Sequence, residues 1–393
     1  MAFEILETET PGTVIKVVGV GGAGGNAVEH MIRRGVQGVE FICANTDHQA
    51  LARSSARNIL QLGLTGLGAG SKPEAGRQAA VEARERIADA LRGAHMVFIT
   101  AGMGGGTGTG AAPVVAEVAK ELGILTVAVV SKPFEFEGPK RAKIADAGLA
   151  ELEERVHSLI VILNNKLEEV LGEDAAMAEC FRAADDVLHN ACAGIAEIIN
   201  IPGLVNVDFE DVKTVMGEHG KAMMGTATAS GLDRARIAAE QAVASPLLEG
   251  VDLSGARGVL VNITASQSLK MKETREVMNT IRAFAAEDAT VIFGTVCDES
   301  IGDDLRVTVV ATGLGRSAAK KQTTPFTVVK TGTDNVPLNV ASPAAASAAG
   351  DYSHFDQPAV WRSRETAAAR VAAMEDAGHD RLDIPAFLRK QAD

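Results

Sequence analysis

Residues 104–110 read Gly-Gly-Gly-Thr-Gly-Thr-Gly, and their glycines and hydroxyls suit the binding of an anion. They follow an apolar run at 96–100 and precede a helical pattern at 111–122, so they should join a strand to a helix. Backbone N–H groups can crowd around a phosphate at such a turn, where the helix end is positive and threonine hydroxyls add donors. No lysine follows, so this is not the loop of P-loop enzymes. The predicted phosphate loop comprises Gly104, Gly105, Gly106, Thr107, Gly108 and Thr109.

A second glycine-rich run, 19–26, follows an apolar run at 14–20 and contains the pattern G-x-G-x-x-G. Asp47 lies about twenty residues further on, which matches the fingerprint of dinucleotide-binding domains and makes an NAD-dependent oxidoreductase an alternative function. A dinucleotide needs one such loop, whereas two glycine loops on one sheet suit a triphosphate, and no obvious acid/base pair for hydride transfer is present. The contacts predicted in this run are Gly21, Gly22, Ala23, Gly24, Gly25 and Asn26.

Acidic residues follow a predicted long helix at 175–200, which ends before Pro202-Gly203. Asp208 and Asp211 are three residues apart and come shortly after Asn206. Two carboxylates at this spacing can orient a water molecule but repel a triphosphate. They are therefore expected to form the part of a hydrolytic site that positions the attacking water.

Taken together, these motifs resemble the tubulin/FtsZ GTPase superfamily, and within it the bacterial cell-division family. The run 104–110 is identical to the superfamily signature G-G-G-T-G-S/T-G. The patterns E-G-x-x-R at 137–141, N-x-D-x-x-D at 206–211 and L-D-I-P-A-F-L-R at 382–389 follow in the family's order. The resemblance implies a GTP-hydrolysing protein that polymerises and builds the division ring. A regulatory module that binds GTP without turnover, or another prokaryotic tubulin-like polymer, remains an alternative.

The same resemblance implies roles for residues outside the two glycine runs. A loop at 68–71 would sense the γ-phosphate through Ala69 and Gly70, although Ser71-Lys72 stands where the family often has Ala-Asn. Glu137 would bind the ribose, and Arg141 would approach the phosphates. The guanine base would meet Asp185, Asn164 and Phe181. Mg²⁺ would be held mainly by phosphates and water rather than by a protein cage.

The family resemblance also places Asn206, Asp208 and Asp211 on the nucleotide of the next subunit. Each subunit would present GTP at one end and this catalytic loop at the other, which produces an open head-to-tail polymer. The helix at 175–200 would link the two.

The C-terminal peptide is apolar, and an apolar peptide on a tether is typical of a docking motif. In the family it binds membrane tethers and regulators of division such as FtsA, ZipA and MinC. The residues expected to dock are Asp383, Ile384, Pro385, Phe387, Leu388, Arg389 and Lys390.

The elements that must position these residues form an α/β fold. Apolar runs at 14–20, 39–44, 96–100, 124–130 and 159–163 alternate with helical patterns, of which 73–91 reads as a single helix. Such alternation predicts a parallel sheet covered on both faces. Further strands are expected at 259–264, 290–296 and 306–312, and helices at 233–243 and 272–285.

The resulting architecture is tubulin-like. It comprises a disordered N-terminus (1–12), a GTP-binding domain (13–174), a central helix (175–202), a C-terminal domain with the catalytic loop (203–316), a flexible linker (317–378) and a docking peptide (379–393).

Composition limits the possible partners. The net charge of −13 argues against nucleic acids and anionic membranes as direct ligands. The four cysteines are scattered, and the eight histidines suggest neither a metal site nor a catalytic base. No signal peptide or membrane-spanning run is apparent, so a cytoplasmic protein is expected, at a midcell ring beneath the inner membrane if the resemblance holds.

Overall fold

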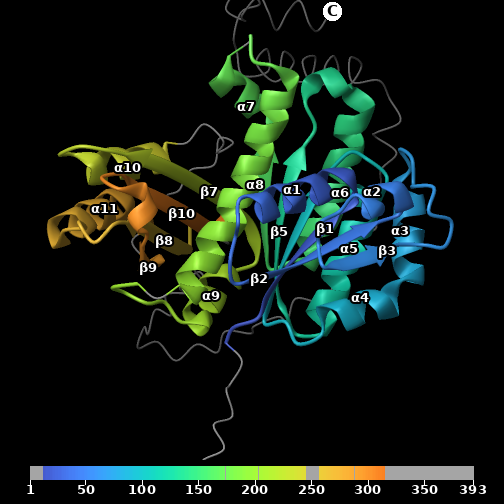
Figure 1. The fold of residues 1–393 in the computed structure, drawn as a ribbon, viewed down its shortest axis with the longest axis horizontal. Helices are drawn as coiled ribbons and strands as arrows, with labels where there is room; N and C mark the ends of the chain where they lie inside the picture. The colour runs from blue at the N-terminus through green and yellow to red at the C-terminus, as the bar shows by residue number, and fades with distance from the viewer. Residues whose placement is uncertain (1–11, 173, 202, 245–255, 287, 315–393) are drawn as a thin grey trace, which may run out of the picture. The chain divides into compact units, whose positions relative to one another are not determined.

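One sheet of ten strands runs through the computed structural model, which describes residues 12–172, 174–201, 203–244, 256–286 and 288–314 (Figure 1). The strand order is β3-β2-β1-β4-β5-β6-β7-β10-β8-β9. The strands are β1 (Ile15–Val20), β2 (Val39–Asn45), β3 (Asn58–Gln61), β4 (Met96–Gly102), β5 (Leu125–Lys132), β6 (Ser158–Leu163), β7 (Gly220–Ala229), β8 (Gly258–Ala265), β9 (Thr290–Cys297) and β10 (Leu305–Leu314).

Helices cover both faces of the sheet (Figure 1). They are α1 (Gly21–Arg33), α2 (His48–Ala52), α3 (Pro73–Glu82), α4 (Arg84–Leu91), α5 (Thr107–Glu121), α6 (Pro139–Arg155), α7 (Asn164–Leu171), α8 (Met177–Asn200), α9 (Phe209–Met216), α10 (Arg234–Val243) and α11 (Met271–Phe284). Two short 3-10 helices, η1 (Glu135–Glu137) and η3 (Glu299–Ile301), lie in connections. None of the helices within the described ranges is long and apolar enough to cross a membrane.

Strands β1 to β6 are all parallel, as predicted for the first half of the chain. Strand β4 shows how the sheet separates two cores. Met96 and Phe98 pack with α1 and α8, whereas Val97 and Ile99 pack with α3, α4 and α5. Alternate side chains of a strand point to opposite faces, so a fully apolar run fits a strand buried on both sides. All carboxyl ends of these strands therefore lie at one edge of the sheet.

The two glycine runs differ in how they meet their helices. Gly104 to Gly106 form the turn that the sequence predicts before α5, which begins at Thr107. The first run is instead already helical from Gly21, where α1 begins. The predicted helix at 73–91 is also divided, because Ala83 leaves helical geometry between α3 and α4.

The long helix predicted at 175–200 is confirmed as α8, and its buried side chains include Leu188 and Ile195. Beyond it, β7 pairs parallel with β6 over three residues and antiparallel with β10 along its length. The part of the chain after α8 therefore continues the same sheet, around a third core formed mainly by β8, β10, α10 and α11. The predicted N-terminal segment up to residue 11, the linker and the docking peptide with Asp383 to Lys390 lie outside the described residues.

Candidate functional site

The two glycine runs meet at the carboxyl edge of the sheet. Gly21 has a φ of 76°, and a Cβ placed on it would lie 2.9 Å from the amide nitrogen of Gly108. Only glycine fits both the backbone conformation and this close approach. The N-terminus of α1 is thus packed directly against the N-terminus of α5.

Helices α1 and α5 both begin without an N-cap that satisfies the N–H groups of their first turn. Neither Val20 nor Gly106, the residues at their N-caps, makes a side-chain cap hydrogen bond, and neither first turn holds an acidic residue. Helix N-termini commonly receive Ser, Thr, Asp or Asn caps, because their first N–H groups lack intrahelical partners. Two adjacent uncapped N-termini can together bind a polyanion such as a triphosphate.

The predicted γ-phosphate loop lies against the second glycine run. A Cβ on Gly106 would collide with the carbonyl oxygen of Gly70 and lie 3.0 Å from the Cβ of Ala69. Thr46, at the end of β2, accepts a backbone hydrogen bond from the Gly68 N–H at 3.0 Å. Its hydroxyl lies 2.6 Å from the hydroxyl of Thr107. The structure therefore brings 68–70 and 104–109 together.

Thr109 differs from the expectation that both threonines of the run offer hydroxyls to a phosphate. Its side chain is buried, and its Oγ1 accepts a hydrogen bond from the Gly104 N–H at 2.8 Å. This hydroxyl therefore stabilises the loop from the protein interior and is not available to a ligand.

The E-G-x-x-R element also reaches the second glycine run. Arg141, in the first turn of α6, packs against Gly104, where an added Cβ would lie 2.7 Å from the arginine Cγ. Glu137 forms an ion pair with Arg141 at 3.0 Å and accepts a hydrogen bond from the Phe134 N–H at 2.9 Å. The pair therefore lies beside Gly104, just before the N-terminus of α5.

The three residues expected at the base lie on two neighbouring helices. Asn164 begins α7, and Phe181 and Asp185 are four residues apart on α8. Asn164 is only 5% exposed, and among the described residues its Oδ1 has no hydrogen-bond partner. Phe181, which is 42% exposed, meets the edge of Phe134 with ring centroids 5.3 Å apart. Burial raises the pKa of Asp185 to about 6. An unpartnered acceptor, an exposed ring and a carboxylate match the N–H donors and the face of a guanine.

A cavity of about 160 Å³ adjoins the first glycine run and identifies residues that sequence reasoning missed. Gly22, Gly25 and Asn26 line one side, and Asn45 lines the other. Asn45 and Thr46 sit where β2 ends, and β2 pairs in parallel with β1. Polar residues that directly follow a buried parallel strand next to a glycine loop were the signal available.

The predicted catalytic loop lies at the other end of α8. Asp208 caps α9 and accepts a hydrogen bond from the Asp211 N–H at 2.8 Å. Asn206 accepts one from the Gly203 N–H at 2.8 Å. Val205 pins the loop to β9 through hydrogen bonds with Thr295 of 2.9 and 3.1 Å. Asn206, Asp208 and Asp211 are exposed, so they are open to a ligand brought from outside the chain.

The catalytic loop and the base site of one chain are far apart. Asp185 and Asn200 are separated by fifteen residues of α8, which span about 22 Å at the helical rise of 1.5 Å per residue. Figure 1 shows α9 at one end of α8 and α7, which begins with Asn164, at the other. Within one chain, the predicted catalytic loop and the predicted base site therefore lie at opposite ends of α8.

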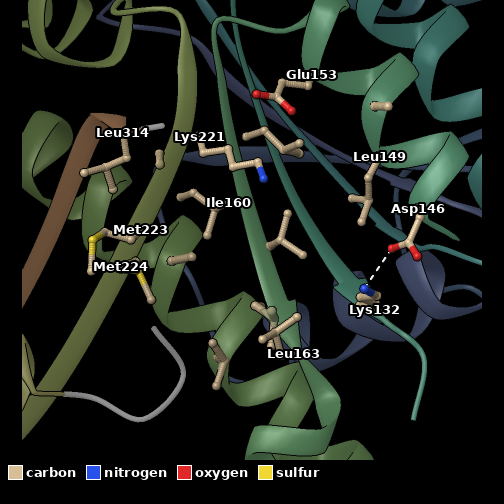
Figure 2. Close-up of a pocket in the computed structure, with 17 residues that line it drawn as sticks. Lys132, Asp146, Leu149, Glu153, Ile160, Leu163, Lys221, Met223, Met224 and Leu314 are labelled. Carbon is tan, nitrogen blue, oxygen red and sulfur yellow. Dashed lines mark ion pairs between the residues drawn. The ribbon is translucent and has the colours of Figure 1, made fainter. Parts of the chain in front are cut away.

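Another cavity, of about 260 Å³, is separate from the glycine loops. It lies between α6 and β7, with Leu149 on one side and Met223 and Met224 on the other (Figure 2). Strands β6 and β7 pair only near their amino ends, so they diverge beside this cavity. Its lining combines apolar side chains with the Lys132–Asp146 ion pair, Glu153 and Lys221. No glycine-rich helix N-terminus is among the described residues that line it.

No group of three or more His, Cys, Asp or Glu side chains in the described ranges is arranged to hold a metal ion. The groups that converge at the glycine loops are backbone N–H groups, hydroxyls and Arg141, which bind anions.

Comparisons with known proteins agree with this geometry. Residues 14–172 match the family model described as "Tubulin/FtsZ family, GTPase domain", and residues 220–315 match "FtsZ family, C-terminal domain". The chain is 56% identical over 401 residues to "Cell division protein FtsZ" of Pseudomonas aeruginosa, covering 100% of both. It is 55% identical to the protein of that name in Coxiella burnetii, covering 99% of each. An FtsZ dimer from M. jannaschii superposes with a TM-score of 0.74 at 44% identity, over 78% of this chain and 89% of that one.

Proposed function

Because the chain belongs to the tubulin/FtsZ family, we propose that it is a cell-division GTPase that polymerises head to tail and hydrolyses GTP between subunits. The family activity is that of a GTPase with a cytoskeletal role in division. Membership does not favour the NAD-dependent oxidoreductase considered from the first glycine run.

GTP would bind along the carboxyl edge of the sheet. The uncapped N-termini of α1 and α5 would hold the phosphates, with Ala69 and Gly70 at the γ-phosphate and Arg141 nearby. Glu137 would bind the ribose if its ion pair with Arg141 loosens. Asp185 would accept hydrogen bonds from guanine N1–H and the exocyclic amine, while Asn164 accepts another and Phe181 packs on the base.

The separation of the two halves of the site carries the proposal of a shared active site. Asp185 and the catalytic loop stand about 22 Å or more apart along α8. Asn206, Asp208 and Asp211 therefore act only on a nucleotide presented by another subunit. A head-to-tail contact between unlike ends does not close on itself, so a filament results.

In that interface Asp208 and Asp211 would orient the attacking water and accept its proton as its oxygen bonds to the γ-phosphorus. The bond from that phosphorus to the β–γ bridging oxygen would break, and GDP and phosphate would leave. Asn206 would help to position it. The carboxylates are held in place because Asp208 caps α9 and Val205 anchors the loop to β9. Mg²⁺, bound through phosphate oxygens and water, would neutralise charge on the transferred group.

The filament would form the ring at the division site, in the cytoplasm beneath the inner membrane. The C-terminal peptide with Ile384 and Phe387 would dock FtsA, ZipA or MinC, so the membrane link would be indirect. These partners follow from the resemblance of L-D-I-P-A-F-L-R at 382–389 to the family's peptide.

The test is GTP turnover measured over a protein dilution series. If the site forms only in filaments, turnover per molecule should fall away below a threshold concentration. Constant turnover per molecule at every dilution would overturn the shared site. Absence of GTP binding at any concentration would overturn the nucleotide site as well.

A further inference from the structure

A histidine on α1 and an aspartate on α8 join the two helices that carry the phosphate and base sites. The Nε2 of His30 lies 2.8 Å from the Oδ1 of Asp186. The Nη2 of Arg34, at the C-cap of α1, lies 2.7 Å from the same oxygen. An ionised carboxylate only accepts hydrogen bonds, so Nε2 carries the hydrogen here. Burial alone would raise the pKa of Asp186, but His30 and Arg34 hold it below its usual value.

The contact is specific to one face of α8. His30 also meets the ring of His189 edge to face, with centroids 6.1 Å apart. Asp186 and His189 are three residues apart, so they share the face that packs on α1. Asp185 is rotated by about 100° from Asp186 around the helix, and it is free to serve the base site.

We propose that His30, Arg34 and Asp186 form a clamp that positions Asp185 for guanine, and so sets the preference for guanine over related bases. Helix α1 begins in the glycine run that would hold phosphates, and α8 carries Asp185 and Phe181. The clamp fixes the rotation of α8 about its own axis and its position along that axis relative to α1. The three side chains hydrogen-bond to one another, so we assign them as positioning residues that act through Asp185.

The expected consequence is selective. A carboxylate aligned with guanine accepts two N–H groups, whereas hypoxanthine lacks the exocyclic amine and offers only one. If α8 shifts, the bond to that amine is lost first. Loosening the clamp should therefore weaken GTP binding more than binding of inosine triphosphate (ITP). A purely structural role would lower thermal stability without changing the ratio of the two affinities.

The experiment compares GTP and ITP affinities by competition, at protein concentrations below assembly. Asp186→Asn keeps the shape of the side chain but removes its charge. GTP binding should weaken on the order of tenfold, the size expected for hydrogen bonds to a charged group, with a smaller loss for ITP. Glu197→Gln is the matched control. Glu197 is on the same helix but far from the base site, and its carboxylate lies 3.0 Å from the guanidinium of Arg306. It should leave the ratio unchanged.

A second pair of variants guards against misfolding. His30→Gln retains a donor for Asp186 and should keep most of the wild-type GTP/ITP ratio, whereas His30→Ala should lose it. Because the inference rests on the proposed base site, the wild-type chain separates the two claims. Equal affinity of the wild type for GTP and ITP would overturn the base site and the clamp together. A wild-type preference that Asp186→Asn and His30→Ala both retain would overturn the clamp alone.

Discussion

The hydroxyls of Thr46 and Thr107 lie 2.6 Å apart and join the end of β2 to the first residue of α5. Thr46 is only 4% exposed, and its carbonyl oxygen also accepts the Gly68 N–H. One buried residue thus holds the second glycine run and the 68–71 loop in register. Sequence reasoning did not single it out, although it contacts both of these loops.

Thr46→Val should weaken GTP binding several-fold. The change keeps the shape of the side chain, removes the hydroxyl and leaves Thr107 without its partner, which costs about 1 kcal/mol. Thr226→Val is the control, since Thr226 and Thr308 form a similar hydroxyl pair at 3.0 Å between β7 and β10. Equilibrium nucleotide binding distinguishes them. Equal affinities of the two variants would show that the Thr46 hydroxyl does not shape the site.

Gly22→Ala should separate folding from binding. A Cβ on Gly22 would meet no atom within 4 Å, so the fold accepts it, and a helical alanine is favoured over glycine by about 1 kcal/mol. However, this Cβ would lie beside the first N–H groups of α1, which we propose to bind the phosphates. The midpoint temperature of thermal unfolding should be unchanged or slightly higher, while GTP affinity falls by about tenfold or more. An unchanged affinity would place the phosphates elsewhere.

GTP affinity should fall as the pH is lowered through about 6. Burial raises the pKa of Asp185 to about 6, so below this pH the free protein holds a neutral carboxyl that no longer accepts both guanine N–H groups. The loss should approach about tenfold per pH unit below that pKa. Asp185→Asn should remove this component and leave only the titration of the phosphates. Identical pH profiles for both proteins would contradict the assignment of Asp185.

The raised pKa of Asp185 affects the stability of the free protein in the opposite direction to GTP affinity. A carboxyl whose pKa is higher in the folded chain than its ordinary 3.8 favours folding at low pH. This contribution to the free energy of unfolding decreases as the pH rises from that value to about 6.

The buried pair of Arg234 and Glu273 should be a major contributor to stability away from the site. Their side chains are 7% and 11% exposed and lie 2.7 Å apart between α10 and α11. Glu273→Gln should cost roughly 3 kcal/mol, because it leaves a buried guanidinium without its counter-charge. Urea unfolding measures this. Glu240→Gln, which removes the partner of exposed Arg236 on the same helix, should change little.

That pair also predicts a pH effect on unfolding. The hydrogen bond from Arg234 lowers the pKa of Glu273 despite burial. Its contribution is therefore complete above the ordinary pKa of 4.5 and is lost as the pH falls through the lowered value. On acidification, the free energy of unfolding should therefore fall more steeply for the wild type than for Glu273→Gln. Equal slopes for the two proteins would contradict this role of Glu273.

The parallel sheet and α8 could be predicted because long apolar runs and helical periodicity are strong signals. The helical start at Gly21 could not, since glycine is a poor helix former and only the packing of Gly21 on Gly108 makes sense of it. Strand β7 was missed because its glycines, threonines and alanines lack an apolar pattern. Its place is determined by pairing with β6 and β10.

The glycine loops and the loop at 206–211 were predicted from motifs, but their side-chain contacts were not. The inward hydroxyl of Thr109 and the hydrogen bonds of Thr46 depend on contacts between segments distant in sequence. His30 looked like an ordinary helix residue, and only the approach of α1 to α8 reveals its partner Asp186. Tertiary contacts of this kind leave no mark on local sequence.

The shared active site is tested most directly by mixing two inactive variants. Asp211→Ala should bind GTP but lack a carboxylate of the predicted catalytic loop. The double variant Gly22→Ala/Gly105→Ala should fold, since both glycines have open space beside them, and keep that loop, but its added methyl groups should block GTP binding. In an equimolar mixture about one interface in four pairs bound GTP with an intact loop, so GTP turnover should recover to about a quarter of wild type. A mixture no more active than its components alone would mean that each chain contains its own complete site.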